Sequence, residues 1–136
     1  CKWADKRLCG KIGGGGNARG DMNNATKSQW FAACSKGGTQ NYCYGSTAKD
    51  VCAANGEAPA SVMSNPDCKG GFDGIFDLSG NAFEWEDSCN ASSGKLDKCR
   101  LRGGAYWNPE ISLRCDVPGW KSRGNGDDGV SFRCCF

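Results

Sequence analysis

The stretch Gly74–Trp85, which reads GIFDLSGNAFEW, decides the fold of this chain. Its first half is apolar around one aspartate, Asp77, and its centre is the polar run Ser79–Asn81. Asp, Ser, Gly and Asn are the residues of tight turns. Beyond the turn, aromatic residues alternate with acidic ones over 83–86, the period-two pattern of a half-buried strand. The stretch therefore predicts a tight polar turn that leads into a strand.

Two carboxylates, Asp77 and Glu84, bracket this turn. Together with backbone carbonyls they can present several oxygens to one hard cation, which suits calcium. The spacing does not match the twelve-residue calcium loop of helix–loop–helix proteins. The residues alone therefore leave two interpretations open, a calcium-binding turn and a plain turn without metal.

The same stretch resembles the sequence G-L-Y-D-M-S-G-N-V-W-E-W of the formylglycine-generating-enzyme (sulfatase-modifying factor) family. Three further segments resemble motifs of that family in the same order: Cys1–Leu8 its C-x-W-A-G-K-R-L, Arg102–Trp107 its R-G-G-S-x-W, and Gly129–Cys134 its terminal I-G-F-R. The resemblance implies an α+β, irregular C-type-lectin-like fold that is loop-rich and disulfide-stapled, with few short strands and one or two helices.

The resemblance also bears on the metal, because the turn stretch of that family holds a calcium ion. Carried over to this chain, it implies calcium as a structural cofactor. The ligands would be the side chains of Asp77 and Glu84 and the backbone carbonyls of Gly80 and Ala82.

The length of 136 residues allows one domain at most. The family's domain is considerably longer, and this sequence begins inside a motif at Cys1. We therefore expect residues 1–136 to be the C-terminal portion of a single domain of this type. Its partner would be the remaining N-terminal part or another chain.

Charge and cysteine content exclude several classes of protein. The net charge is only +2, and basic residues are interspersed with acidic ones, which does not indicate nucleic-acid binding. No apolar run is long enough to span a membrane. The chain has 11 Cys, no His and no C-x-x-C pair, which favours disulfides over zinc. We expect an oxidising location, extracellular, periplasmic or at the cell surface.

Local patterns predict the remaining elements. Residues 26–36 are expected to form a helix, because Thr26 and Gln29 can form a capping box and Trp30 lies on its apolar side. Trp30 is expected in the core, as the matching family helix places its Trp there. Residues 111–115 are expected to form a short strand, and residues 130–136 a core strand.

Sequence alone does not determine how cysteines pair. The resemblance implies two bonds, Cys1–Cys134 and Cys34–Cys115. For the remaining cysteines we expect Cys9–Cys135, a loop-closing Cys52–Cys68 and a local Cys89–Cys99. Cys43 is then left over from this pairing, so it is either free or bonded to another chain.

The chemistry of the family does not carry over. Its enzymes are copper-dependent oxidases that use two cysteines, five positions apart, just after R-G-G-S, and two thiolates suit Cu(I). Here Asn108 stands at the first of these positions, and no cysteine lies between Gly104 and Cys115. The absence of His also excludes Ser–His and Cys–His nucleophile pairs. We therefore expect no copper and no catalytic residue.

Aromatic residues among polar ones in the last third of the chain indicate a recognition surface. The candidate residues are Tyr106, Trp107, Asn108, Trp120 and Arg123; the alternative is that the Trp side chains fill the core. The leading hypothesis is a non-catalytic extracellular lectin-like module that binds protein or glycan, or serves as a subunit of a surface structure. The alternatives are a copper-dependent sulfatase-modifying oxidase and a purely structural, crosslinked assembly subunit with Cys43 or exposed Trp residues at its contacts.

Overall fold

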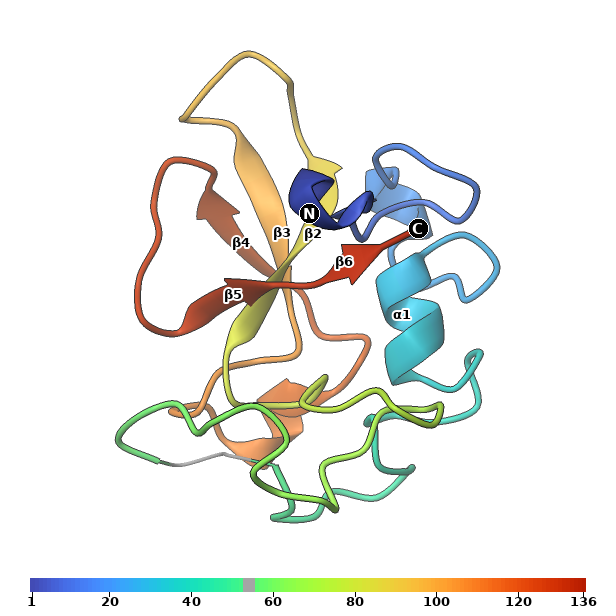
Figure 1. Cartoon of the computed structure of the whole chain (residues 1–136), viewed down its shortest axis with the longest axis vertical. Coiled ribbons are helices and arrows are strands. Elements are labelled where there is room, and N and C mark those ends of the chain that lie inside the picture. Colours follow the sequence, from blue (N-terminus) through green and yellow to red (C-terminus); the bar gives the residue numbers. More distant parts are fainter. Residues whose placement is uncertain (53–55) are drawn as a thin grey trace.

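The computed structural model describes residues 1–52 and 56–136. Within them the protein is a small α+β molecule made mostly of loops (Figure 1). The helices are α1 (Gln29–Cys34) and three short 3-10 turns, η1 (Lys2–Ala4), η2 (Arg19–Asp21) and η3 (Glu110–Leu113). The strands are β1 (Arg7–Leu8), β2 (Phe83–Cys89), β3 (Lys98–Arg102), β4 (Gly119–Ser122), β5 (Val130–Phe132) and β6 (Cys134–Cys135).

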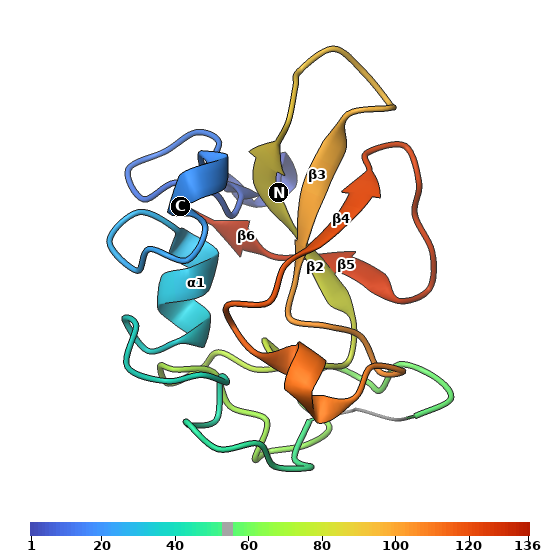
Figure 2. The same cartoon turned by 180° about the vertical axis from the view of Figure 1, so that it is seen from behind.

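The strands form two sheets. The larger has the order β4-β3-β2-β5, in which β2 and β3 are antiparallel and β5 runs parallel to β2. In the smaller, β1 pairs antiparallel with β6. β5 pairs with β2, and β6, which follows β5 in the chain, pairs with β1. The last residues of the chain therefore connect the larger sheet to the N-terminal segment. The two ends of the chain consequently lie side by side, as both views show (Figures 1 and 2).

Five disulfides staple these loops, and they join the same pairs that we expected from the sequence. Cys1–Cys134 and Cys9–Cys135 tie the N-terminal segment to β6. The other bonds are Cys34–Cys115, Cys52–Cys68 and Cys89–Cys99. Cys43 is a free, buried cysteine with 2% of its surface exposed, so a bond from Cys43 to another chain would require it to come to the surface.

Sulfur and one tryptophan dominate the core. Trp30 is fully buried, as predicted, and packs with Leu78. Around them lie five cysteines, Cys34, Cys43, Cys52, Cys68 and Cys115. A core this small removes little apolar surface from water, so we infer that the crosslinks contribute much of the stability.

Three of the predicted elements differ from the structure. The core strand expected at residues 130–136 is wrong: β5 and β6 are separate short strands that belong to different sheets, and none of these residues is buried. Helix α1 begins three residues later than expected, because Ser28 caps it by accepting the Phe31 N–H at 3.0 Å, whereas Thr26 bonds Asn24. The strand expected at residues 111–115 is wrong: η3 covers Glu110–Leu113. Leu113 is buried there against Gly104, where a Cβ would lie 2.5 Å from Leu113 Cδ2. Within the described residues, every helix is too short and too polar to cross a bilayer.

Candidate ligand-binding groove

Strand β2 positions the candidate site by turning its acidic residues inward. The strand alternates as predicted, but Glu84 and Glu86 are buried, whereas the aromatic rings of Phe83 and Trp85 lie on the half-exposed face. A buried carboxylate is costly unless it is paired and hydrogen-bonded. The partners of both glutamates therefore explain this orientation.

Glu84 links three separate parts of the chain. Its Oε2 accepts the indole N–H of Trp30 at 2.9 Å and the Nε–H of Arg133 at 3.0 Å. Its Oε1 accepts from Arg133 Nη2 at 2.7 Å. Burial acts to lower the pKa of Arg133, but the adjacent Glu84 outweighs it and raises that pKa. Three charge-assisted hydrogen bonds thus satisfy this carboxylate.

Glu86 lies deeper and is fully buried. Its Oε1 accepts from Ser28 Oγ at 2.7 Å and from Asn17 Nδ2 at 3.0 Å, and its Oε2 lies 3.6 Å from Arg102 Nε. Arg102 is also fully buried, and desolvation lowers its pKa to about 10 even though Glu86 acts to raise it. This inward network holds β2 in one register, which directs Trp85 away from the core.

The outward face of β2 forms the floor of a hollow of about 710 Å³. We call it the β1–β2 groove. Apolar side chains of Leu8, Trp85 and Phe132 line it. Its remaining lining comes mostly from charged residues and cystines: Cys1, Lys2, Lys6, Arg7, Glu86, Asp87, Cys89, Cys99 and Arg123.

The groove has a basic rim over an aromatic floor. Four of its residues carry a positive charge, Lys2, Lys6, Arg7 and Arg123, against two acids. Of the acids, Glu86 is directed into the internal network and contributes its charge there. Arg7 is held by its own backbone contacts, since its guanidinium donates to the Leu8 and Lys11 carbonyls. The arrangement suits a ligand that is anionic and has an apolar face.

The five residues that we predicted as one ligand surface lie in three different places. Tyr106, Trp107 and Asn108 belong to the turn after β3: Tyr106 is buried, its ring packs edge-on against Trp107 at 4.7 Å, and Asn108 Oδ1 caps the Ala105 N–H at 2.8 Å. Trp120 stacks on Arg100, at 3.9 Å, and lines a second hollow. Arg123 alone reaches the β1–β2 groove.

Sequence reasoning missed most of the groove. Trp85 was part of the predicted strand, but its outward direction depends on partners of Glu84 and Glu86 that lie far away in the chain. Lys2, Lys6 and Arg7 reach the groove only because β1 pairs with β6. One sequence signal could have found the groove. The predicted strand contains two glutamates, and the chain also contains an indole and two arginines that can pair with glutamates in the interior.

The residues predicted to bind calcium border another hollow, of about 560 Å³, in which Asp77, Ala82 and Glu84 meet Arg133. Asp77 Oδ2 accepts the Met63 N–H at 2.8 Å, and the Gly80 N–H donates to Gly103 O at 2.7 Å. Calcium takes six to eight oxygens, whereas both oxygens of Glu84 are already bound to Arg133 or Trp30. In this arrangement the residues do not fit calcium, because binding of the ion would require Arg133 to leave Glu84.

A thermal-unfolding comparison tests this point. Because Arg133 neutralises Glu84, we expect the unfolding midpoint to be the same in millimolar calcium as in EGTA, since only a ligand of the native state raises it. Differential scanning calorimetry at constant ionic strength, with magnesium as the matched control, gives the answer. A calcium-specific rise of several degrees would show that the turn holds the ion.

The place to which the resemblance would assign a copper site offers no thiolate. Asn108, which the resemblance aligns with the first cysteine, caps a turn. Cys115 is bonded to Cys34, so its sulfur is not a thiolate ligand. The residues at this place do not fit copper.

Comparison with known proteins adds information on the fold alone. No family model matches the chain, and no curated protein matches it. The crystal structure of CarF is similar, with a TM-score of 0.60 and 17% sequence identity. The match covers 95% of this chain and 46% of the CarF chain, so this chain spans less than half the length of that protein.

Proposed function

We propose that this protein is a non-catalytic binding module with a lectin-like fold, and that the β1–β2 groove binds an anionic glycan. The observation that carries the proposal is the groove itself, in which four basic residues surround an apolar floor that includes Trp85 and Phe132. Concave sites with apolar walls and a few convergent polar groups are the usual form of ligand sites.

The chemistry of the groove favours a glycan that bears carboxylate or sulfate groups. Aromatic rings offer flat apolar faces, against which the apolar face of a sugar ring can pack. Guanidinium and ammonium groups form strong, charge-assisted hydrogen bonds to carboxylate and sulfate oxygens. A neutral glycan would use the floor but leave the rim unpaired.

The groove is also rigid enough to bind without large rearrangement. Cystine Cys1–Cys134 contributes Cys1 to the lining, Cys89–Cys99 contributes both of its residues, and β1 and β2 supply others. A site held in its bound shape loses less conformational entropy on binding. The same five disulfides support an extracellular, periplasmic or cell-surface location, where such bonds persist.

A titration with defined oligosaccharides tests this function. We expect a heparin-derived hexasaccharide to bind and dextran of similar size not to bind, in isothermal calorimetry at low salt. The double variant Lys2→Ala/Lys6→Ala is expected to bind at least about tenfold more weakly, since a hydrogen bond to a charged group contributes roughly 1.5–3 kcal/mol.

The matched control is Lys49→Ala/Lys69→Ala, which removes the same charge away from the groove. It is expected to change the affinity less than twofold. Equal weakening by both double variants would indicate attraction by net charge alone and would contradict a site in the groove. Equal binding of dextran would contradict recognition of the anionic groups.

A second candidate function is that of a subunit in an assembly, favoured by one observation. Trp3 and Phe136 are each 85% exposed, and each lies near one end of the chain. Exposed apolar patches of this kind often mark contacts between proteins. Sedimentation equilibrium at micromolar concentration without glycan distinguishes the two: a stable oligomer that Trp3→Ser disperses would favour assembly.

A further inference from the structure

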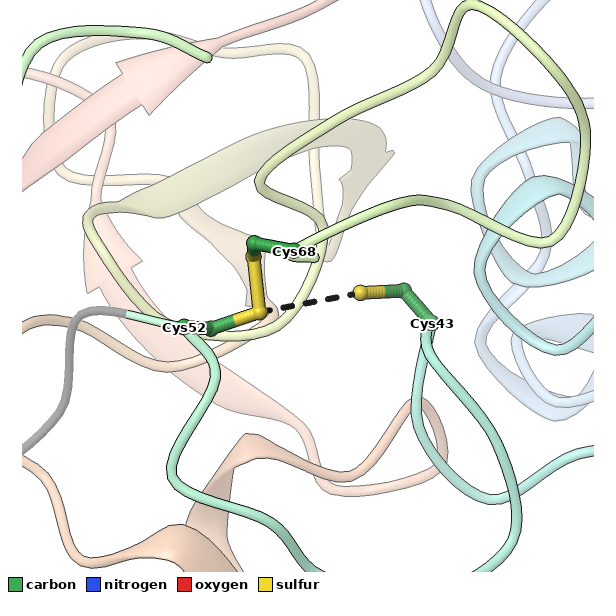
Figure 3. Close-up of side chains that lie close together, drawn as sticks. All are labelled: Cys43, Cys52 and Cys68. Carbon is green, nitrogen blue, oxygen red and sulfur yellow. Dashed lines mark hydrogen bonds between the residues drawn. A yellow bond between two sulfur atoms is a disulfide. The ribbon is translucent and has the colours of Figure 1, made fainter. Parts of the chain in front are cut away.

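One free thiol lies beside a disulfide in the core. Cys43 Sγ is 4.0 Å from Cys52 Sγ, which is bonded to Cys68 (Figure 3). All three sulfurs lie within 4.8 Å of one another. None of the three residues exposes more than 2% of its surface, so this group is separated from bulk solvent.

We propose that Cys43, Cys52 and Cys68 form an internal thiol–disulfide exchange site, a role separate from the groove. The Cys43 thiol loses its proton and the thiolate attacks Cys52 Sγ. The Cys43–Cys52 bond forms as the Cys52–Cys68 bond breaks, and Cys68 leaves as a thiolate that takes up the proton. One disulfide and one thiol are present before and after, so the step needs no external oxidant or reductant.

The turn in the stretch Gly74–Trp85 holds the reacting groups close together. Ser79 is fully buried, and its Oγ accepts the Cys43 N–H at 3.1 Å. The backbone oxygen of the same residue lies 3.8 Å from Cys68 Sγ. A thiol and the sulfur that would leave are therefore both packed against one residue. Because all three sulfurs lie within 4.8 Å of one another, Cys43 Sγ lies beside the Cys52–Cys68 bond, and attack in line with that bond requires the Cys43 side chain to turn.

Exchange would change which loop is closed. The present bond closes residues 52–68, a sequence separation of 16, whereas the new bond would close residues 43–52. Segment 56–67 would then depend on its hydrogen bonds to the turn. Asn81 both accepts from Ala60 N and donates to Ala60 O, and Asp77 accepts from Met63 N. Exchange is thus expected to loosen the cover of the hollow that Asp77 and Asn81 line.

The surroundings of Cys43 set the pH at which exchange begins. Burial raises the pKa of the thiol, and the charge of Asp77 adds to the rise, while hydrogen bonds from Ser79 and Leu78 partly offset it. Arg133 and Tyr44 also face this thiol. Charged residues that border the adjoining hollow are Lys36, Asp67, Lys69 and Asp73. Because the thiolate is the nucleophile, the rate is expected to rise about tenfold per pH unit below that pKa.

Disulfide mapping of the unmodified protein tests the proposal. The native protein is held at pH 7, 8 and 9, acidified, unfolded, and alkylated at low pH before acid digestion. We expect alkylation at Cys68 as well as Cys43, together with a Cys43–Cys52 linked peptide, and a faster approach to this mixture at higher pH. Alkylation confined to Cys43 at every pH would overturn the proposal, and Cys43→Ser should show no alkylation.

A second variant tests the geometry independently. Cys68→Ser leaves Cys43 and Cys52 as a pair of thiols, and glutathione disulfide is expected to convert them to one bond, so that the thiol count falls from two to zero. Two thiols that persist in a folded variant would contradict the proposed approach of Cys43 to Cys52. If near-UV circular dichroism shows that the variant is unfolded, the mapping of the unmodified protein decides.

Discussion

Replacing Arg133 by methionine is expected to lower the free energy of unfolding by about 3 kcal/mol. The substitution removes the only cation that pairs with Glu84 among the described residues and leaves that carboxylate 7% exposed with one indole N–H. Loss of one partner of a buried ion pair typically costs 3–5 kcal/mol. We take the lower end, because 27% of the Arg133 side chain is exposed. Urea denaturation followed by tryptophan fluorescence measures the effect.

Two further variants separate the buried charge from packing. Arg133→Met/Glu84→Gln removes the unpaired charge and is expected to be more stable than Arg133→Met alone. Arg114→Met breaks a surface ion pair with Asp116, in which the side chains are 30% and 40% exposed, and should cost about 0–1 kcal/mol. Equal losses for Arg133→Met and Arg114→Met would show that Glu84 does not depend on its pairing.

Removal of both terminal disulfides is expected to cost about 7–8 kcal/mol, enough to unfold most small domains at 25 °C. The sequence separations of Cys1–Cys134 and Cys9–Cys135 are 133 and 126, so the first bond to form closes a loop worth roughly 5 kcal/mol. With that bond in place, the second closes a ring of only about ten residues, which contributes roughly 2–3 kcal/mol. Either bond alone therefore substitutes for most of the other.

Guanidinium denaturation of the single-bridge and double-bridge serine variants measures this non-additivity. Loss of either terminal bridge alone should cost about 2–3 kcal/mol. The matched control is loss of Cys89–Cys99, whose sequence separation of 10 gives a ring of similar size. A cost of about 5 kcal/mol for each single variant would contradict the idea that the two bridges are redundant.

The parts of the fold that the sequence predicts are those determined locally or by ordered motifs. Gly103 shows why one motif is readable: its φ is +86°, and a Cβ there would lie 2.6 Å from the Leu78 carbonyl, so only glycine is accommodated without strain. Trp30 and the β2 strand were predicted for similar reasons, since each stands in a distinctive local pattern. The structural role of each of these residues can be predicted from the residues next to it in the sequence.

The direction of the side chains on β2 could not be predicted in the same way. The alternation over 83–86 does not tell which of the two sets of side chains faces the core. Hydrophobicity alone would place Phe83 and Trp85 inside. The outcome depends on Trp30, Arg102 and Arg133, which satisfy the two glutamates from other parts of the chain. The candidate groove follows from that inversion, so it became visible only once these long-range contacts were known.

The bond between Cys1 and Cys134 also decides how the molecule responds to tension. A force that pulls residue 1 away from residue 136 is carried by this covalent link, so the sheets and the core bear almost none of it. In an optical-trap experiment the oxidised chain would lengthen by the reach of its last two residues, roughly 7 Å. Reduction of the terminal bridges alone would release residues 1–34 and 115–136 to extension, because the Cys34–Cys115 bond still bypasses the residues between them. Under mechanical load, the oxidised protein therefore behaves as a short inextensible link between whatever its two ends are attached to.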